Sequence, residues 1–207
     1  MDREREHMHE QKADPFEAIQ NFLAKMSGTP QNYWAEFAVD IPFGTALVSA
    51  GLRSNKHEPF MDLFIVLLGL VLYSIIEYSF HRWLFHGPVR VLAQGHRAHH
   101  ANPLGYDSLP FFVPVVVLST LTGILALIIP LNHAMLLVGT ITLSYVVYGL
   151  SHFTIHHHRF QHAVARSWAA PHLIHHYHPD ANFGVTTPLW DRVLGTYYKY
   201  DHKKIIA

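Results

Sequence analysis

Three stretches of this 207-residue sequence are almost free of charge over lengths that few soluble folds can bury. Residues 111–130 and 134–151 contain no charged side chain, and residues 60–80 have a 14-residue uncharged centre. A helix of about 20 residues, rising 1.5 Å per residue, spans the roughly 30 Å hydrocarbon core of a bilayer. We therefore expect membrane-spanning helices over about 60–80, 111–130 and 134–152.

A fourth apolar segment, residues 37–53, is weaker because Asp40 leaves only the 12 residues from Ile41 to Leu52 uncharged. If this segment also spans, 13 of the 15 Lys and Arg residues lie on one face of the membrane; if it does not, the split is 9 against 6. The positive-inside rule places the basic face in the cytoplasm. Four spans are therefore favoured, with both termini cytoplasmic.

The fold class predicted is an all-α integral membrane protein, with four transmembrane helices in two hairpins under a cytosolic helical cap. The cap comprises residues 81–110 and 153–207. Residues 33–207 form this membrane domain, and residues 1–32 form a polar and amphipathic N-terminal segment. Within that segment, apolar residues recur at helical spacing over residues 15–26. Both an interfacial membrane helix and an ordinary surface helix fit this pattern.

Composition excludes several classes of protein. Only 14 % of the residues are charged, against about 25 % in an average soluble domain. The 15 basic and 15 acidic residues balance, so there is no global field for a nucleic-acid partner. Cysteine is absent, which excludes disulfides, thiolate zinc sites and cysteine-ligated iron–sulfur clusters.

Histidine is strongly over-represented, since 15 of the 19 histidines lie between His81 and His178. Residues three or four apart share one face of an α-helix. The members of each HxxHH run should therefore share a face, as should the pair His152 and His156. His81 and His86 are five residues apart, or about 140° around an α-helix, and are expected to reach two neighbouring ions instead of holding one. The four clusters are His81 and His86; His96, His99 and His100; His152 and His156 to His158; and His172, His175, His176 and His178.

This spacing favours a dinuclear metal centre. Imidazole suits iron, zinc, copper and nickel, and without a metal each buried ring nitrogen must find its own hydrogen-bond partner. Two other interpretations are unrelated surface histidines and a histidine-rich tract that only sequesters metal. Neither explains why two of the clusters lie at the ends of apolar spans.

These motifs resemble those of a known family. The stretch Ile76-Glu77-Tyr78 before His81, the HRAHH, HFTIHH and HLIHHYH runs, and the run from Phe183 to Thr196 are similar to the membrane fatty acid hydroxylase and sterol desaturase superfamily. Fatty acid 2-hydroxylase is the most similar branch, and the resemblance covers roughly residues 37–198. It implies a non-haem di-iron centre held by ten histidines: His81, His86, His96, His99, His100, His152, His156, His172, His175 and His176.

The resemblance also implies a division of these ligands between two ions. One ion would take His81, His96, His99, His152 and His172, and the other would take His86, His100, His156, His175 and His176. The sequence departs from the 2-hydroxylase pattern after the first HxxHH run, where Ser108 replaces an arginine and Asp107 is displaced. This departure leaves the head group and the acyl substrate open.

Two acidic residues are candidates for supporting the metal ligands. Glu77 lies one helical turn before His81, and a carboxylate in a membrane span usually faces a functional interior. We expect it to hold a ligand imidazole in its tautomer; an ion pair with Arg82 is the alternative. Asp191 is a candidate for the same role, with a turn or cap residue as the alternative.

The function predicted from these features is O2-dependent hydroxylation of a lipid by two iron ions, with zinc possible in the purified protein. The sequence has no GxGxxG, P-loop, flavin or haem signature, so an external ferredoxin or cytochrome b5 would supply electrons, and the lipid would enter from the bilayer. A desaturase with the same centre is one alternative. A membrane metal-binding or transport protein is another, although the uncharged span centres count against transport. A hydrolytic dizinc enzyme fits less well, because the implied ligands include no carboxylate.

Overall fold

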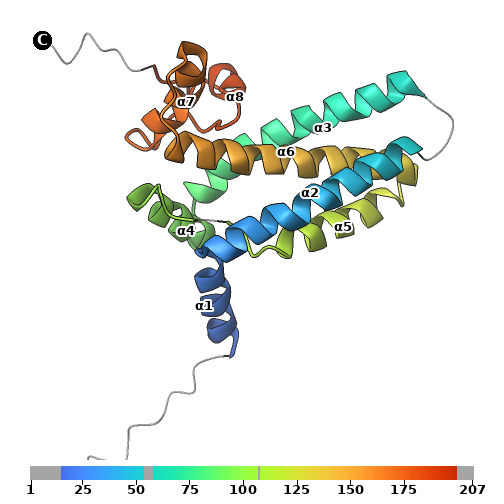
Figure 1. Ribbon diagram of the computed structural model, residues 1–207, viewed down its shortest axis with the longest axis horizontal. Coiled ribbons are helices and arrows are strands. Elements are labelled where there is room, and N and C mark those ends of the chain that lie inside the picture. The colour runs from blue at the N-terminus through green and yellow to red at the C-terminus, as the bar shows by residue number, and fades with distance from the viewer. Residues whose placement is uncertain (1–14, 54–57, 107, 200–207) are drawn as a thin grey trace, which may run out of the picture.

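The computed structural model describes residues 15–53, 58–106 and 108–199, and these residues are helical with connecting turns. Four helices form an elongated bundle (Figure 1): α2 (Pro30–Arg53), α3 (Pro59–Ser79), α5 (Val113–Leu125) and α6 (Leu131–His157). The shorter helices α4 (Arg90–Ala101), α7 (Ala163–His175) and α8 (Leu189–Val193) gather at one end of the bundle, which we call the cap end. Helix α1 (Pro15–Ser27) projects from the same end. Residues 1–14 and Asp107 lie outside the described residues.

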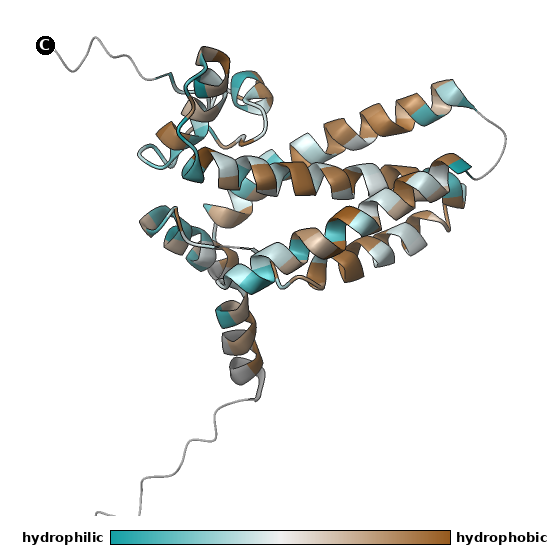
Figure 2. Cartoon of the chain, viewed as in Figure 1, coloured by the Kyte–Doolittle hydropathy of each residue, from teal (hydrophilic) through white to brown (hydrophobic). Residues whose placement is uncertain are grey.

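Among the described residues, three helices are long and apolar enough to cross a membrane: Pro30–Arg53, Pro59–Phe85 and Leu131–His157. Hydrophobic residues run along the bundle, and hydrophilic ones concentrate in α4 and at the cap end (Figure 2). Large apolar side chains point outward from the bundle, including Phe64, Leu67 and Val116, each more than half exposed. Such a surface suits a hydrocarbon environment.

The first expected span proves to be longer than its uncharged run. Helix α2 begins at Pro30, seven residues before the predicted boundary, because proline is favoured in the first turn of a helix. Its polar residues Glu36 and Asp40 are both buried, so their charges do not face the surrounding medium. The 24-residue helix is therefore long enough to span.

The expected 20-residue helix over residues 111–130 is wrong in length. Helix α5 has 13 residues, or about 20 Å, and residues Ala126 to Ile129 continue it only as turns. The cause is Pro130, since a proline disfavours helical backbone at the preceding residue. The count of four spanning helices therefore remains a prediction.

The tight turn expected at residues 131–133 is also wrong. These residues form the first turn of α6, with Pro130 as its N-terminal cap in extended conformation. The fixed φ of proline lets a new helix start directly after it. The chain therefore reverses over residues 126–130, just before the position predicted.

Close packing of α2 against α6 depends on glycine. A Cβ built on Gly139 of α6 would lie 2.8 Å from the backbone nitrogen of Val48, and one on Gly44 of α2 would lie 2.9 Å from Leu143. A Cβ built on Gly149 of α6 would likewise lie 2.9 Å from the ring of Phe37. Small residues let helix backbones approach closely where lipid offers no hydrophobic drive for association. This contact aligns the cap ends of α2 and α6.

Candidate metal centre

The ten histidines implied by the resemblance come together at the cap end, in two groups of five. In each group, one nitrogen from every ring lies within 4.8 Å of the corresponding nitrogens of the other four. The first group is His81, His86, His96, His100 and His175; the second group is His99, His152, His156, His172 and His176. The division differs from the one implied by the resemblance, which mixed members of these two groups.

Helix periodicity explains the observed division. Residues four apart on one helix stay together: His96 with His100, His152 with His156, and His172 with His176. The middle histidine of each HxxHH run crosses to the other group. His99 of α4 joins the second group, and His175 of α7 joins the first. Each HxxHH run therefore serves both groups, and α4 and α7 exchange one histidine each.

The expectation that His81 and His86 would reach different ions is wrong. His81 lies on the π-helix η1 (Phe80–Phe85), which continues α3, and His86 is the C-terminal cap of η1. The backbone amide of His86 donates to the carbonyl of His81 at 3.2 Å, which is the i to i+5 bond of a π-helix. In this wider turn, residues five apart share a face. Both rings therefore enter the first group, as a pair four apart would on an α-helix.

The nitrogens of the first group converge in a way that hydrogen bonds cannot satisfy. The Nε2 atom of His96 lies 3.0 Å from that of His81, 2.9 Å from that of His86 and 3.0 Å from that of His100. His81 and His175 direct Nδ1 to backbone carbonyls, so in their neutral forms the Nε2 atoms carry lone pairs. One imidazole nitrogen cannot donate a proton to three neighbours.

A metal ion fits this arrangement. Two imidazole nitrogens bound at right angles, each about 2.1 Å from an ion, lie roughly 3.0 Å apart. The closest separations in the first group, 2.9 to 3.0 Å, have that value. In the second group, the Nε2 atoms of His156 and His172 lie 2.9 Å apart. The Nε2 atom of His99 is buried and has no hydrogen-bond partner within the part of the chain that the structure describes, as expected for a ligand atom.

The two groups adjoin each other. The rings of His100 and His176, one from each group, stack with centroids 4.3 Å apart. His99 and His100 are consecutive in sequence and belong to different groups, with their ring centroids 6.1 Å apart. Two ions held by these groups would be close neighbours.

Burial keeps these imidazoles neutral. Desolvation, together with repulsion from neighbouring imidazoles, lowers the pKa of His86 to about 4 and that of His99 to about 3. Desolvation also lowers the pKa of His175 to about 3 and that of His176 to about 2. Neutral imidazole is the form that binds metal.

Neither Glu77 nor Asp191 contacts an imidazole in the way we expected. Glu77 instead accepts hydrogen bonds from the backbone amides of Val185 and Thr186, at 2.7 and 2.9 Å, and from the Thr186 hydroxyl. The alternative ion pair of Glu77 is not formed either, since Arg82 donates to the Tyr78 hydroxyl at 2.8 Å.

Asp191 is fully buried and holds the same loop. It accepts from the amides of Phe183 and Gly184, both at 2.8 Å, and from the Thr196 hydroxyl. Glu77 and Asp191 therefore both hold the loop of residues 181–187.

Sequence reasoning missed the loop carbonyls. The Nδ1 atom of His81 donates to the carbonyl of Phe183, and that of His175 donates to the carbonyl of Ala181 at 2.7 Å. Backbone acceptors leave no residue-type signal, so no motif could have marked them. The only indirect sign in this part of the sequence is Asn182, a residue type that favours turns.

The remaining clustered histidines stay outside the two groups. His157 is exposed and stacks on Phe153, His162 accepts from an amide at the start of α7, and the ring of His178 contacts that of Tyr198. His158 contacts Phe160, and His133 lies in the first turn of α6.

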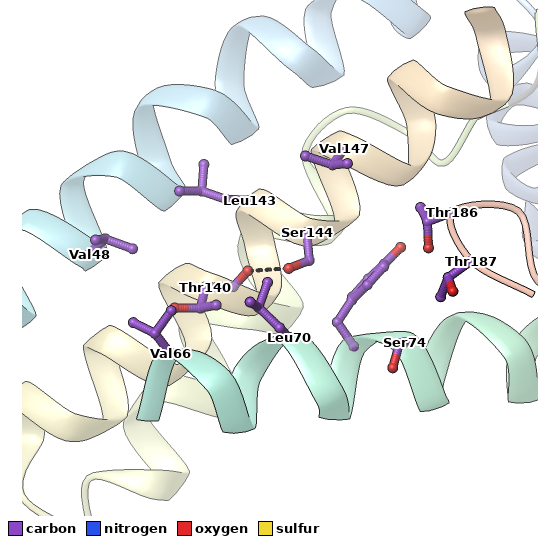
Figure 3. A pocket seen from close by; sticks show the side chains of 11 residues that line it. Val48, Val66, Leu70, Ser74, Thr140, Leu143, Ser144, Val147, Thr186 and Thr187 are labelled. Atoms are coloured by element: carbon purple, nitrogen blue, oxygen red, sulfur yellow. Dashed lines mark hydrogen bonds between the residues drawn. The ribbon is translucent and has the colours of Figure 1, made fainter. Parts of the chain in front are cut away.

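An apolar cavity of about 470 Å³ lies between α3 and α6, on the membrane side of the centre. Val48, Val66 and Thr140 line one end, Leu70 lies near the middle, and Thr186 and Thr187 of the 181–187 loop line the other end (Figure 3). The lining is mainly apolar, and hydroxyl side chains occur along its length, from Thr140 beside Val66 to Thr186 and Thr187 at the loop.

Comparison with known proteins decides the family. A family model described as fatty acid hydroxylase matches residues 66–196. The chain belongs to the fatty acid hydroxylase family. The matched range contains all ten histidines of the two groups, together with Glu77 and Asp191.

Individual relatives support the same membership. The chain is 28 % identical to dihydroceramide fatty acyl 2-hydroxylase FAH2 of Arabidopsis thaliana, over 79 % of this chain and 73 % of the relative. It is 32 % identical to fatty acid 2-hydroxylase of Macaca fascicularis, over 77 % of this chain and 46 % of the relative. A solved structure of full-length scs7p, in which only the hydroxylase domain is visible, matches with a TM-score of 0.71 and 27 % identity. That match covers 86 % of this chain and 70 % of the other.

Proposed function

We propose that this chain is an O2-dependent lipid hydroxylase whose two histidine groups each hold one iron ion. The reaction would convert a C–H bond, O2, two electrons and two protons into a C–O–H group and water. The bound ions would supply O2 reduction and attack on the unactivated C–H bond, which amino-acid side chains cannot perform. The single observation that carries the proposal is the convergence of ten imidazoles in two adjoining groups.

The ten histidines would hold the ions, and the surrounding chain would orient them. Burial keeps the imidazoles available as neutral ligands at physiological pH. Glu77 and Asp191 fix the loop whose carbonyls orient His81 and His175. Partners of this kind set the tautomer and direction of a ligand ring.

A fatty acyl chain is the substrate that fits the cavity between α3 and α6. Its lining is mainly apolar, and one end lies at Thr186 and Thr187, in the loop whose carbonyls contact His81 and His175. An acyl chain would therefore lie along the bundle with its polar end toward the metals. The names of the relatives refer to fatty acyl 2-hydroxylation, which supports hydroxylation next to the carboxyl or amide end.

Four crossings of the membrane, with the centre and both termini in the cytoplasm, are part of the proposal. Asn32 accepts from the amide of Phe111 at the cap end of α2, whereas Gly51, near its other end, lies against the backbone of Asn132. The segment of residues 111–131 therefore runs along the length of α2, although α5 itself is short. The basic residues of the cap would face an external electron donor, a ferredoxin or a cytochrome b5.

Lipid mass spectrometry tests this function. Cells expressing the chain with each donor type should accumulate an acyl lipid that is heavier by one oxygen atom, and cells expressing His175→Ala should not. A species that has lost two hydrogens would instead identify a desaturase. Absence of both products with either donor, from protein shown to contain iron, would contradict the proposal.

A further inference from the structure

One turn of backbone holds two ligands of the first group. Ala181 and Phe183 flank Asn182, and their carbonyls accept from the Nδ1 atoms of His175 and His81. The two rings lie with centroids 4.4 Å apart. The geometry of this turn therefore sets the direction of two of the five imidazoles in the first group.

Asn182 gives the turn its shape. Its φ of 57° lies in the left-handed region, which is costly for most residues but accessible to asparagine. The residue is fully buried, and its side chain donates to the carbonyl of Tyr198 at 2.9 Å and accepts from the amide of Tyr198 at 2.8 Å. Its own amide donates to the carbonyl of Thr196 at 3.0 Å. These three bonds fix the turn to the segment after α8.

The second group is oriented differently. Among residues 15–53, 58–106 and 108–199, several of its ring nitrogens are buried with no protein partner: Nε2 of His99, Nδ1 of His172, and both nitrogens of His176. The Nε2 atom of His99 has the place of a ligand atom. The first group has two Nδ1–H groups fixed by one loop, whereas the rings of His172 and His176 have no such orienting partner among the described residues. The two groups are therefore inequivalent in how the protein orders them.

We propose that Asn182 is a positioning residue for the first metal ion and not for the second. Its turn holds the lone pairs of His81 and His175 toward the first ion before that ion binds. The inference rests on the proposed function, because it takes both groups to be metal sites. Loss of a partner that orients a metal ligand typically weakens metal binding by about 10- to 100-fold. We expect a loss of this size at the first site only.

The test is Co²⁺ binding to the full-length chain, purified in detergent and stripped of metal. Co²⁺ is followed by its visible absorption, and bound metal is counted by elemental mass spectrometry. The wild type should bind two ions per chain. Asn182→Gly keeps the left-handed backbone accessible but removes both side-chain bonds. It should bind one ion with wild-type affinity and the other about 10- to 100-fold more weakly.

A second substitution identifies the site affected. His152→Ala removes a ligand of the second group, so the double variant Asn182→Gly/His152→Ala should lose tight binding altogether. Trp168→Phe is the matched control, because it removes a 3.2 Å hydrogen bond to the Thr186 carbonyl in the same loop while leaving both ligand-bonded carbonyls in place. It should bind two ions as the wild type does.

Each other outcome overturns the inference. If Asn182→Gly binds both ions with wild-type affinity, the turn does not position the ligands. If both ions weaken equally, with helix content by circular dichroism either kept or lost, Asn182 supports the whole cap and not one site. Two ions per chain in the wild type would uphold the metal centre in either case, so failure of this inference is distinct from failure of the proposed function.

Discussion

His100 and His176 stack across the boundary between the two histidine groups, with ring centroids 4.3 Å apart and ring planes 21° apart. One ring belongs to each group, so the two positions are near neighbours in space with different expected roles. The pair allows each proposed metal site to be removed separately without changing distant parts of the fold.

Removal of the imidazole of His100 or of His176 should lower the number of bound ions by one and abolish most of the activity. His100→Ala should leave the second group loaded, His176→Ala should leave the first loaded, and each should lower lipid hydroxylation at least about 100-fold because both ions are needed. Metal analysis and product analysis of the purified variants check this. The exposed His157 lies outside both groups, and His157→Ala should retain two ions. Full activity in His100→Ala would contradict the ligand assignment.

One methyl group added at Gly87, just after the π-helix η1, should weaken metal binding by the first group. A Cβ at Gly87 would overlap the carbonyl oxygen of Trp83, so Gly87→Ala must shift the backbone beside His86. We expect Gly87→Ala to weaken the first metal site by about 10-fold or more, measured by Co²⁺ titration. Gly28→Ala meets only an ordinary contact at 3.9 Å and serves as the control. Unchanged Co²⁺ affinity in Gly87→Ala would argue against a strict requirement for the π-helix.

The sequence predicted that the histidines gather at one end of the helices, but it did not predict how they divide between the two groups. Helical spacing placed His152 and His156 on one face, and the structure puts them in one group, whereas the division implied by the resemblance had separated them. The same reasoning separated His81 from His86, since a π-helix has no reliable signal in a single sequence. The crossing of His99 and His175 depends on how α4 and α7 face each other, which is a tertiary property.

Glu77 shows a second limit of sequence reasoning. Its spacing placed it on one face with His81, but sharing a face does not determine which partner the carboxylate takes. Its partners, Val185 and Thr186, lie more than 100 residues away in sequence. A long-range contact between a helix and a loop leaves no periodic pattern to detect.

The close packing of α2 on α6 predicts that an alanine substitution lowers stability at Gly139 but not at Gly123. Gly139→Ala would place a methyl group 2.8 Å from the backbone of Val48, and overpacking of this kind costs about 1–3 kcal/mol. Gly123 on α5 faces open space, so Gly123→Ala should be neutral or stabilising by up to about 1 kcal/mol through helix propensity. Thermal unfolding in detergent checks both. An equal melting temperature for the two variants would refute the close contact.

Acid should destabilise the metal-free protein. Burial holds the pKa of His99 and His175 at about 3 in the folded chain, whereas an unfolded histidine titrates near 6.5. Between these values the unfolded chain binds more protons, so the free energy of unfolding falls as pH is lowered. The melting temperature of metal-stripped protein should be level from pH 8 to 7 and decrease below pH 6. A melting temperature that rises as the pH is lowered would contradict the lowered pKa values of these buried histidines.

The cavity should set the length of acyl chain accepted. Val66 lines its end away from the cap (Figure 3), and Val66→Trp would shorten the space available to the chain terminus. The product profile should shift toward shorter acyl chains, as measured by lipid mass spectrometry. Leu67→Trp, on the exposed face of the same helix, should leave the profile unchanged. An identical shift in both variants would argue that the substrate does not occupy this cavity.

The most direct test of the central claim is the fate of ¹⁸O2 supplied to the purified, iron-loaded chain in lipid vesicles with a reducing donor. The account predicts that one ¹⁸O atom enters a fatty acyl chain, that the other leaves as water, and that His175→Ala incorporates none. Unlabelled product, oxygen drawn from water, or unsaturated product without added oxygen would contradict the assignment of this chain as an O2-dependent hydroxylase.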